Sequence, residues 1–151
     1  PAKPVTVAWS VTLGCAVEPA VQAVAAQQHW RVITITKAGC PFTQANVIRV
    51  IKERSAPYTS CTTWDAAAMK LLLSGPNRPD LVFTSSFYPY IAAVAGQPDR
   101  QAGARNDAEL IAGLRGAWRT LNNAGIPVIV LRETPLMGRD VAPASRSTGT
   151  T

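Results

Sequence analysis

The sequence predicts an α/β fold in which parallel strands form a sheet that helices cover on both faces. Apolar segments at residues 5–9 and 30–36 flank a helical segment at residues 19–29, which is the pattern of a strand–helix–strand unit with parallel strands. Residues 126–131 are apolar throughout, as is typical of a parallel strand covered on both faces. With 151 residues and 47% hydrophobic content, the chain has the size of one domain and can bury a substantial core.

The first strand, residues 5–9, and the turn after it, residues 10–15, form the stretch around which we expect a site. In open α/β sheets, ligands bind beyond the carboxyl ends of the strands, so hydroxyl residues placed there are candidates for chemistry. Ser10 and Thr12 are the hydroxyl residues of this turn. Ser and Thr are also favoured in turns and at helix N-caps, and this stretch alone favours that structural role.

The next turn should open on the same edge of the sheet. Residues 19–29 fit a helix that ends at His29, where the helix dipole favours this side chain and makes a role as general base the weaker interpretation. After the second strand, residues 37–42 read Lys-Ala-Gly-Cys-Pro-Phe. Gly39 allows close approach of the backbone, so N–H groups of this loop are candidate oxyanion donors. The structural interpretation is a Gly-Pro turn anchored by a disulfide, and we expect both roles to hold together.

The middle of the chain is less regular. Residues 45–54 fit neither helix nor strand spacing well, and their length favours a short helix. We expect a polar loop at residues 55–60 and then a helix that begins at Cys61. Thr62 and Asp65 have the spacing of a capping box at its start. The inward face of this helix is predicted to comprise Trp64, Ala68, Leu71 and Leu72.

A third strand at residues 79–86 ends in hydroxyl residues. By the same edge argument, Ser85 and Ser86 should face the cleft near Ser10 and Thr12, where they would bind a ligand or an oxyanion, or cap the next segment. Aromatic residues follow and would either form a wall for a sugar or simply pack in the core, the latter being the commoner role: Phe87, Tyr88 and Tyr90.

The last third predicts a loop, a long helix and a terminal tail. Residues 96–105 are rich in Gly, Gln, Asp and Arg and are expected to form a mobile surface loop, a candidate lid. Asn106 is the predicted N-cap of the next helix. Its apolar stripe comprises Leu110, Ile111, Leu114, Trp118 and Leu121. We therefore expect one domain at residues 1–142 and a flexible or truncated tail at residues 143–151; a start at Pro1 without Met suggests a processed or excised fragment.

Composition excludes several classes of function. The formal charge of +6 is spread along the chain without a basic run, which argues against a nucleic-acid partner and fits either an anionic envelope surface or simple solubility. No apolar segment approaches the ~20 residues of a membrane helix, and no signal-peptide pattern opens the chain. A Gly-rich phosphate loop after the first strand is absent, which argues against a nucleotide-binding flavodoxin-like protein.

The cysteines do not form a metal-binding pattern. Cys15, Cys40 and Cys61 are too widely spaced for close pairs of zinc ligands, and His29 is the only histidine, so we predict no metal. In an oxidising compartment Cys40 and Cys61 would close a loop of about 20 residues, worth roughly 3 kcal/mol in the chain-entropy model. Three free buried thiols are the alternative.

Five segments together resemble the SGNH domain of acyltransferase-3 family membrane proteins. They are Lys-Ala-Gly-Cys-Pro-Phe at 37–42, Cys-Thr-Thr-Trp at 61–64, Pro-Asp-Leu-Val-Phe at 79–83, Gly-Ile-Pro-Val-Ile-Val at 125–130 and Glu-Thr-Pro-Leu-Met-Gly-Arg-Asp-Val at 133–141. The resemblance implies a three-layer, flavodoxin-like α/β/α hydrolase fold in an extracytoplasmic domain whose parent protein is tethered to the membrane. It also implies a Cys40–Cys61 disulfide, transfer of an acyl group to a cell-envelope glycan, and no cofactor.

The sequence departs from that family in its catalytic motifs. Family members have Gly-Asp-Ser-His after the first strand, and the ungapped placement puts Thr12 where the nucleophilic serine belongs; a shift of two residues would give the role to Ser10. No histidine follows His29, so the late Asp-x-x-His motif is absent. An unactivated hydroxyl is a weak nucleophile. The chain is thus either an incomplete acyltransferase domain, with oxyanion donors near Gly39 and Ser85, or a noncatalytic module that binds glycan or a partner protein.

Overall fold

The computed structural model describes residues 6–11, 18–51, 54–75, 78–85, 91–92 and 103–131. Several features that the sequence singled out lie outside these residues. They are Thr12, Cys15, Ser86, the aromatic group at residues 87–90, the first part of the predicted lid and everything after Leu131, including the predicted tail.

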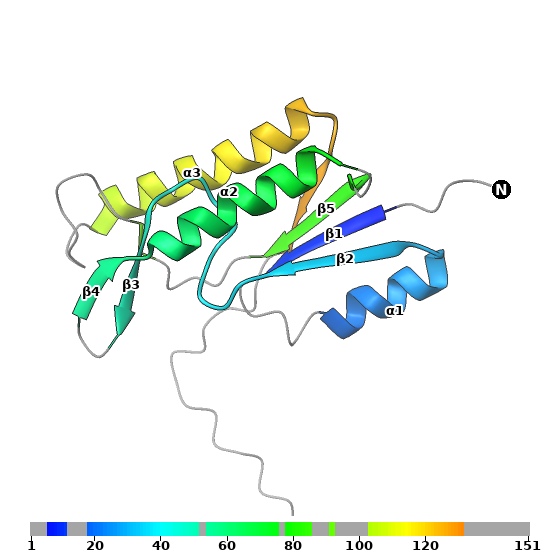
Figure 1. Ribbon diagram of the computed structural model, residues 1–151, viewed down its shortest axis with the longest axis horizontal. Coiled ribbons are helices and arrows are strands. Elements are labelled where there is room, and N and C mark those ends of the chain that lie inside the picture. The colour runs from blue at the N-terminus through cyan, green and yellow to red at the C-terminus, as the bar shows by residue number, and fades with distance from the viewer. Residues whose placement is uncertain are drawn as a thin grey trace, which may run out of the picture.

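A parallel sheet forms the centre of the fold (Figure 1). Each of its neighbouring strand pairs is parallel, as the strand–helix–strand pattern predicted. The strand order is β2-β1-β5-β7. The bounds are Thr6–Val11 for β1, Arg31–Thr36 for β2, Leu81–Ser85 for β5 and Val128–Val130 for β7. The fold class is therefore α/β, as predicted.

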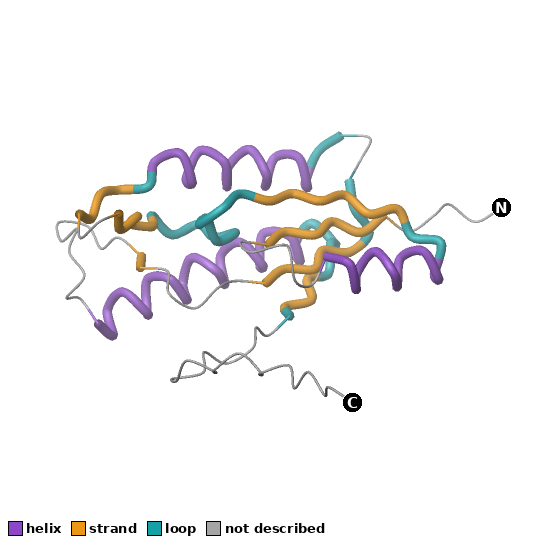
Figure 2. Tube along the Cα trace, turned by 90° about the horizontal axis from the view of Figure 1, so that it is seen from below, coloured by secondary structure: helices purple, strands orange, loops and turns teal. Residues whose placement is uncertain are grey.

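Helices lie on both sides of this sheet. Figure 1 shows α2 and α3 side by side on one side and α1 on the other, and in Figure 2 these helices and the strands of the parallel sheet run along the long axis. The bounds are Glu18–Gln28 for α1, Thr59–Leu73 for α2 and Gly103–Asn123 for α3. None of the described helices combines the length and the apolar character that a membrane span requires.

The main core lies between α2, α3 and the sheet. Successive side chains of β5 point to opposite faces of the sheet. Val82 is buried in this core, whereas Phe83 lies against Trp30 and α1 on the other face. The buried members of the core are Ile35, Phe42, Ala68, Leu72, Val82, Ala117, Leu121 and Ile126.

A small antiparallel sheet occupies the region where the sequence predicted a short helix and a loop. Its strand order is β4-β3-β6, with bounds Val47–Ile51 for β3, Arg54–Pro57 for β4 and Ile91–Ala92 for β6. The predictions for residues 45–54 and 55–60 were therefore wrong. β-Branched residues suit a strand, and pairing with the distant β6 fixed the outcome. Pro57 is tolerated because β4 is an outer strand.

The helix starts also differ from the prediction. Helix α2 begins at Thr59 after an N-cap at Tyr58 that makes no side-chain capping bond, so Thr62 and Asp65 lie inside the helix and form no capping box. Helix α3 begins at Gly103, three residues before the predicted cap at Asn106, so the last residues of the predicted lid are helical. Helix ends depend on tertiary contacts as well as on capping residues, which explains these shifts.

Four apolar residues predicted to be covered are instead half exposed. Leu71 and Ile111 are each 46% exposed, because each lies at the margin of the helical stripe rather than at its centre. In β7, Ile129 is 42% exposed and Val130 is 47% exposed. This strand ends the sheet order among the described residues, so the helices that cover the central strands do not fully cover it.

The end of α1 confirms the predicted position of His29. Its backbone has φ of 55°, and its N–H donates to Ala26 O, while the N–H of Trp30 donates to Ala25 O at 2.8 Å. This left-handed residue ends the helix and turns the chain into β2.

Candidate functional site

The carboxyl ends of the parallel strands meet at one edge of the sheet, which is the candidate site. Val11, the last residue of β1, pairs with Thr36 at the end of β2 and with Ser85 at the end of β5. The sequence predicted this common edge from the parallel topology. Ligands in open α/β sheets gather at such an edge, because loops from several strands open there.

The structure moves Ser10 from the predicted turn into the strand. Ser10 pairs with Ile35 of β2 and with Thr84 of β5, so it lies within β1, and the strand ends one residue later, at Val11. The structure describes Ser10 by its place in the strand and not by its side chain. Thr12 is the first residue after the end of β1 in the sequence.

The loop after β2 begins with a tight turn at Gly39. The Cys40 N–H donates to Lys37 O at 3.2 Å, and Gly39 has φ of 69°, which glycine adopts without strain. Tyr58 holds this turn, because its hydroxyl donates to Ala38 O at 3.1 Å and its ring lies 5.8 Å from Lys37 Nζ. Gly39 is exposed at the candidate edge.

Of the other predicted site residues, Ser85 is described and Ser86 is not. Ser85 is the last residue of β5 and is only 5% exposed. It follows Phe83 by two residues, so the alternation of the strand places both on the same face of the sheet. Ser85 therefore reaches the candidate edge from a buried position.

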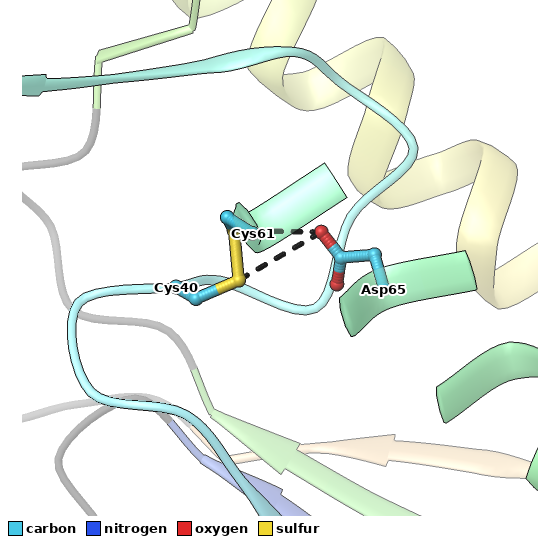
Figure 3. A group of neighbouring side chains, drawn as sticks. All are labelled: Cys40, Cys61 and Asp65. Atoms are coloured by element: carbon cyan, nitrogen blue, oxygen red, sulfur yellow. Dashed lines mark hydrogen bonds between the residues drawn. A yellow bond between two sulfur atoms is a disulfide. The ribbon is translucent and has the colours of Figure 1, made fainter. Parts of the chain in front are cut away.

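A disulfide anchors the loop after β2 to helix α2 (Figure 3). It joins Cys40 in the loop to Cys61 in the first turns of α2, with 5.5 Å between the Cα atoms. Both residues are buried, with exposed fractions of 1% and 0%. This is the bridge that the family resemblance implied.

The sequence prediction missed the buried carboxyl group of Asp65, which lies against this disulfide (Figure 3). Its Oδ2 atom lies 3.6 Å from Cys61 Sγ and 3.9 Å from Cys40 Sγ, and its Oδ1 atom accepts a hydrogen bond from the Thr43 N–H at 3.3 Å. Burial raises the pKa of Asp65 to about 7, against the opposing effect of the Thr43 hydrogen bond.

A signal for Asp65 was present in the sequence. It follows Cys61 by four residues and precedes Ala68 and Leu72 by three and seven, so it occupies the apolar stripe of its own helix. A carboxyl group in such a stripe indicates a buried polar contact. The capping interpretation concealed it, because that interpretation required the helix to begin later.

These three side chains do not form a metal site while the disulfide is intact. The sulfur atoms of Cys40 and Cys61 and a carboxylate oxygen of Asp65 all lie within 4.8 Å of one another. Cysteine binds metals as thiolate, however, and both sulfurs are bonded to each other here. The cluster is therefore a disulfide with a buried acid beside it.

The same loop is also anchored on helix α3. The Gln44 N–H donates to Gly113 O at 3.1 Å, and Gln44 Nε2 donates to Thr120 Oγ1 at 3.1 Å. Gly113 allows this approach, because a Cβ atom there would lie 2.5 Å from the Ala45 Cβ. The loop beside the candidate edge is thus held by α2 and α3 together.

Comparison with known families then identifies the chain. A family model described as "SGNH domain (fused to AT3 domains)" matches residues 13–150. The chain belongs to this SGNH family. The family's fusion to AT3 domains indicates an accessory domain of a membrane acyltransferase. No curated protein and no solved structure matches the chain significantly.

The limits of the match bear on the site. The matched segment begins at residue 13, just after both candidate nucleophiles, Ser10 and Thr12. It extends to residue 150, so it takes in most of the segment that the sequence suggested to be a separate tail, residues 143–151. The SGNH match therefore covers the disulfide, Asp65 and the loop after β2, but not the first catalytic motif.

Proposed function

We propose that this chain is the extracytoplasmic SGNH domain of a membrane O-acyltransferase and passes an acyl group to a cell-envelope glycan. The membrane acyltransferase domain of the parent protein delivers the acyl donor. The observation that carries the proposal is membership of a family fused to AT3 domains. The parallel sheet supports it by bringing three strand ends to one edge. The complete domain is then a three-layer α/β/α sandwich of the flavodoxin-like SGNH type.

In this proposal, Thr12 is the nucleophile. Its hydroxyl attacks the carbonyl carbon of the acyl donor, the donor's leaving group departs, and a glycan hydroxyl then takes the acyl group from Thr12. The ungapped family placement favours Thr12 over Ser10, and Ser10 itself lies within β1, where it pairs with strands on both sides. Backbone N–H groups near Gly39 and Ser85 hold the oxyanion.

The base that activates the hydroxyl comes from outside these residues. No histidine follows His29, and His29 ends helix α1 beside the start of β2, whereas the candidate edge lies at the strand ends. A hydroxyl nucleophile needs a base within hydrogen-bond reach. In this proposal the rest of the parent protein or a partner chain supplies it, and the transfer uses neither a metal nor a cofactor.

Substitution of Thr12 in the parent protein tests this mechanism. We expect Thr12→Ala to reduce acyl transfer to the rate in buffer, because no acyl-enzyme can form, and Ser10→Ala to leave the rate within about twofold. Thr12→Ser should raise the rate, because it removes a methyl group that crowds the attack. The measurement is transfer of a labelled acyl group to purified envelope glycan. Equal rates in the parent and in Thr12→Ala would overturn this assignment.

A noncatalytic glycan-binding module is the second candidate. It is favoured by the threonine in the nucleophile position and by the absence of the Asp-x-x-His motif. On this alternative, neither the parent nor any Thr12 or Ser10 variant transfers acyl groups above the buffer rate. The purified domain would nevertheless retard envelope glycan in an affinity column, using the aromatic residues 87–90 that the sequence singled out.

Counting thiols tests the extracytoplasmic placement. In protein isolated from its native envelope and denatured with an alkylating agent present, we expect Cys40 and Cys61 to escape labelling, and both to be labelled after reduction. The physical reason is that disulfides persist outside the cytoplasm, whereas cytoplasmic thiols stay reduced. Mass spectrometry of the peptides that contain these two cysteines measures the labelling. Full labelling of both without reductant would contradict this placement.

A further inference from the structure

The contact between Asp65 and the disulfide raises the question of where the hydrogen lies. Asp65 Oδ2 is 3.6 Å from Cys61 Sγ and 3.9 Å from Cys40 Sγ (Figure 3). A sulfur atom in a disulfide carries no hydrogen and cannot donate one. A hydrogen bond in this contact therefore requires the protonated carboxyl group as its donor.

Reduction reverses these roles. Each thiol of a reduced pair is a weak donor, and a carboxylate is an acceptor only. With Cys40 and Cys61 reduced, two S–H groups can donate to Oδ2 while the Thr43 N–H continues to donate to Oδ1. A carboxylate that accepts two or three hydrogen bonds is strongly favoured over its protonated form. Burial thus favours the protonated acid in the oxidised cluster, whereas the thiol donors favour the carboxylate in the reduced cluster.

We propose that Asp65 and the Cys40–Cys61 disulfide form a proton-coupled redox unit, in which reduction of the disulfide releases the proton of Asp65. An external dithiol supplies two electrons and two protons, and becomes a disulfide. The Cys40–Cys61 sulfur–sulfur bond breaks, and each sulfur takes one of these protons. The Asp65 O–H bond breaks, and its proton passes to water. One proton therefore enters the solution for each disulfide reduced.

The groups that face Asp65 determine whether its proton is coupled to the disulfide. From the loop after β2 it faces Cys40 and the Thr43 amide, and from its own helix it faces Cys61. Among the described residues packed against Cys40 and Cys61 is Tyr58, whose hydroxyl donates to Ala38 O and whose ring lies below Lys37. Burial, which raises the pKa of Asp65, and the Thr43 hydrogen bond, which lowers it, are the causes of its shift among the described residues.

The proton coupling also keeps the loop in place. Reduction removes the covalent link between the loop and α2. At the same time the Asp65 carboxylate gains a full charge, and hydrogen bonds to charged acceptors are stronger than those to neutral ones. The Thr43 N–H bond to Oδ1 therefore tightens when the disulfide opens. The loop beside the candidate edge would keep its position in both redox states.

The equilibrium with a small dithiol tests the proposal. Because a proton is released only where oxidised Asp65 is protonated and reduced Asp65 is not, the equilibrium constant for reduction by dithiothreitol should rise about tenfold per pH unit between the two midpoints of Asp65. It should level off above about pH 7, where oxidised Asp65 loses its own proton. In Asp65→Asn the constant should not change with pH over this range. Asp107→Asn, an exposed carboxyl group on α3, should behave as wild type. Redox states are trapped by acid and alkylation and measured by mass.

A titration of the wild-type protein alone gives a second test. The carboxyl carbon of Asp65, followed by NMR, should titrate at least one pH unit lower in the folded reduced protein than in the oxidised protein. Equal midpoints in the two states would overturn the proposal, as would the same pH dependence of the exchange constant in wild type and Asp65→Asn. A reduced protein that is unfolded at every pH would also overturn it, because the coupling requires a folded reduced state.

Discussion

Asp65→Asn is expected to stabilise the folded, oxidised protein strongly at pH 8 and hardly at all near pH 4. The pKa of Asp65 is raised from 3.8 to about 7 in the folded state, so between these values the folded protein holds a proton that the unfolded chain has lost. Stability therefore falls as the pH rises from about 4 to 7 and is flat above. Three pH units of difference correspond to roughly 4 kcal/mol.

The asparagine side chain reproduces the protonated acid. Its oxygen can accept from the Thr43 N–H, and its amide group can donate toward the sulfurs. Because an amide does not ionise between pH 4 and pH 9, asparagine adds no pH-dependent loss of stability. Urea unfolding of wild type and variant from pH 4 to pH 9 gives the difference in free energy of unfolding, which cancels the other titrating groups. Asp107→Asn, on the exposed face of α3, is the control. A stability difference that does not change with pH would contradict the prediction.

The glycines of helix α3 provide a matched pair of substitutions. Gly113→Ala is expected to destabilise the protein by about 2 kcal/mol, because the new methyl group would overlap the backbone of Ala45 and lie 2.5 Å from Thr43 Oγ1. The loop cannot move away from α3, because the disulfide and Asp65 hold it against α2. This loss includes the gain of about 1 kcal/mol in helix propensity that alanine brings.

Gly116→Ala is the control for this effect. It lies one turn further along the same helix, and its added methyl group would meet the far end of the flexible Gln44 side chain instead of backbone. Gln44 can swing away at the loss of its exposed hydrogen bond to Thr120. We expect a stability within about 0.5 kcal/mol of wild type, because helix propensity offsets that loss. Equal effects in the two variants, measured by urea unfolding, would show that the loop does not press on Gly113.

The glycine result bears on function through the loop that it touches. This loop contains Gly39, Cys40 and Thr43, and we propose backbone N–H groups near Gly39 as oxyanion donors. An oxyanion donor must be held in place before the reaction. Anchors on α2 and on α3 provide that rigidity without a contribution from the candidate edge itself. Gly113→Ala should therefore also lower any acyl transfer that the parent protein performs.

The sequence alone determined the parallel sheet and the edge at which its strands end. Segments such as residues 30–36 and 126–131 are strongly apolar or β-branched over their whole length, so local preference and the tertiary structure agree. The alternation with helices then required parallel neighbours. The resemblance to the SGNH domain supplied what periodicity could not, namely the pairing of Cys40 with Cys61.

Only the tertiary structure decided the small antiparallel sheet, the buried acid and the position of Ser10. Residues 47–51 and 54–57 became strands because β6, far along the chain, completes their sheet, and no local pattern encodes such a partner. Asp65 is buried because the loop that begins at Cys40 folds over it, which raises its pKa. Ser10 lies in the strand because both neighbours continue to pair with it. Periodicity reports which face of an element is apolar, whereas burial of a polar group depends on residues that only folding brings together.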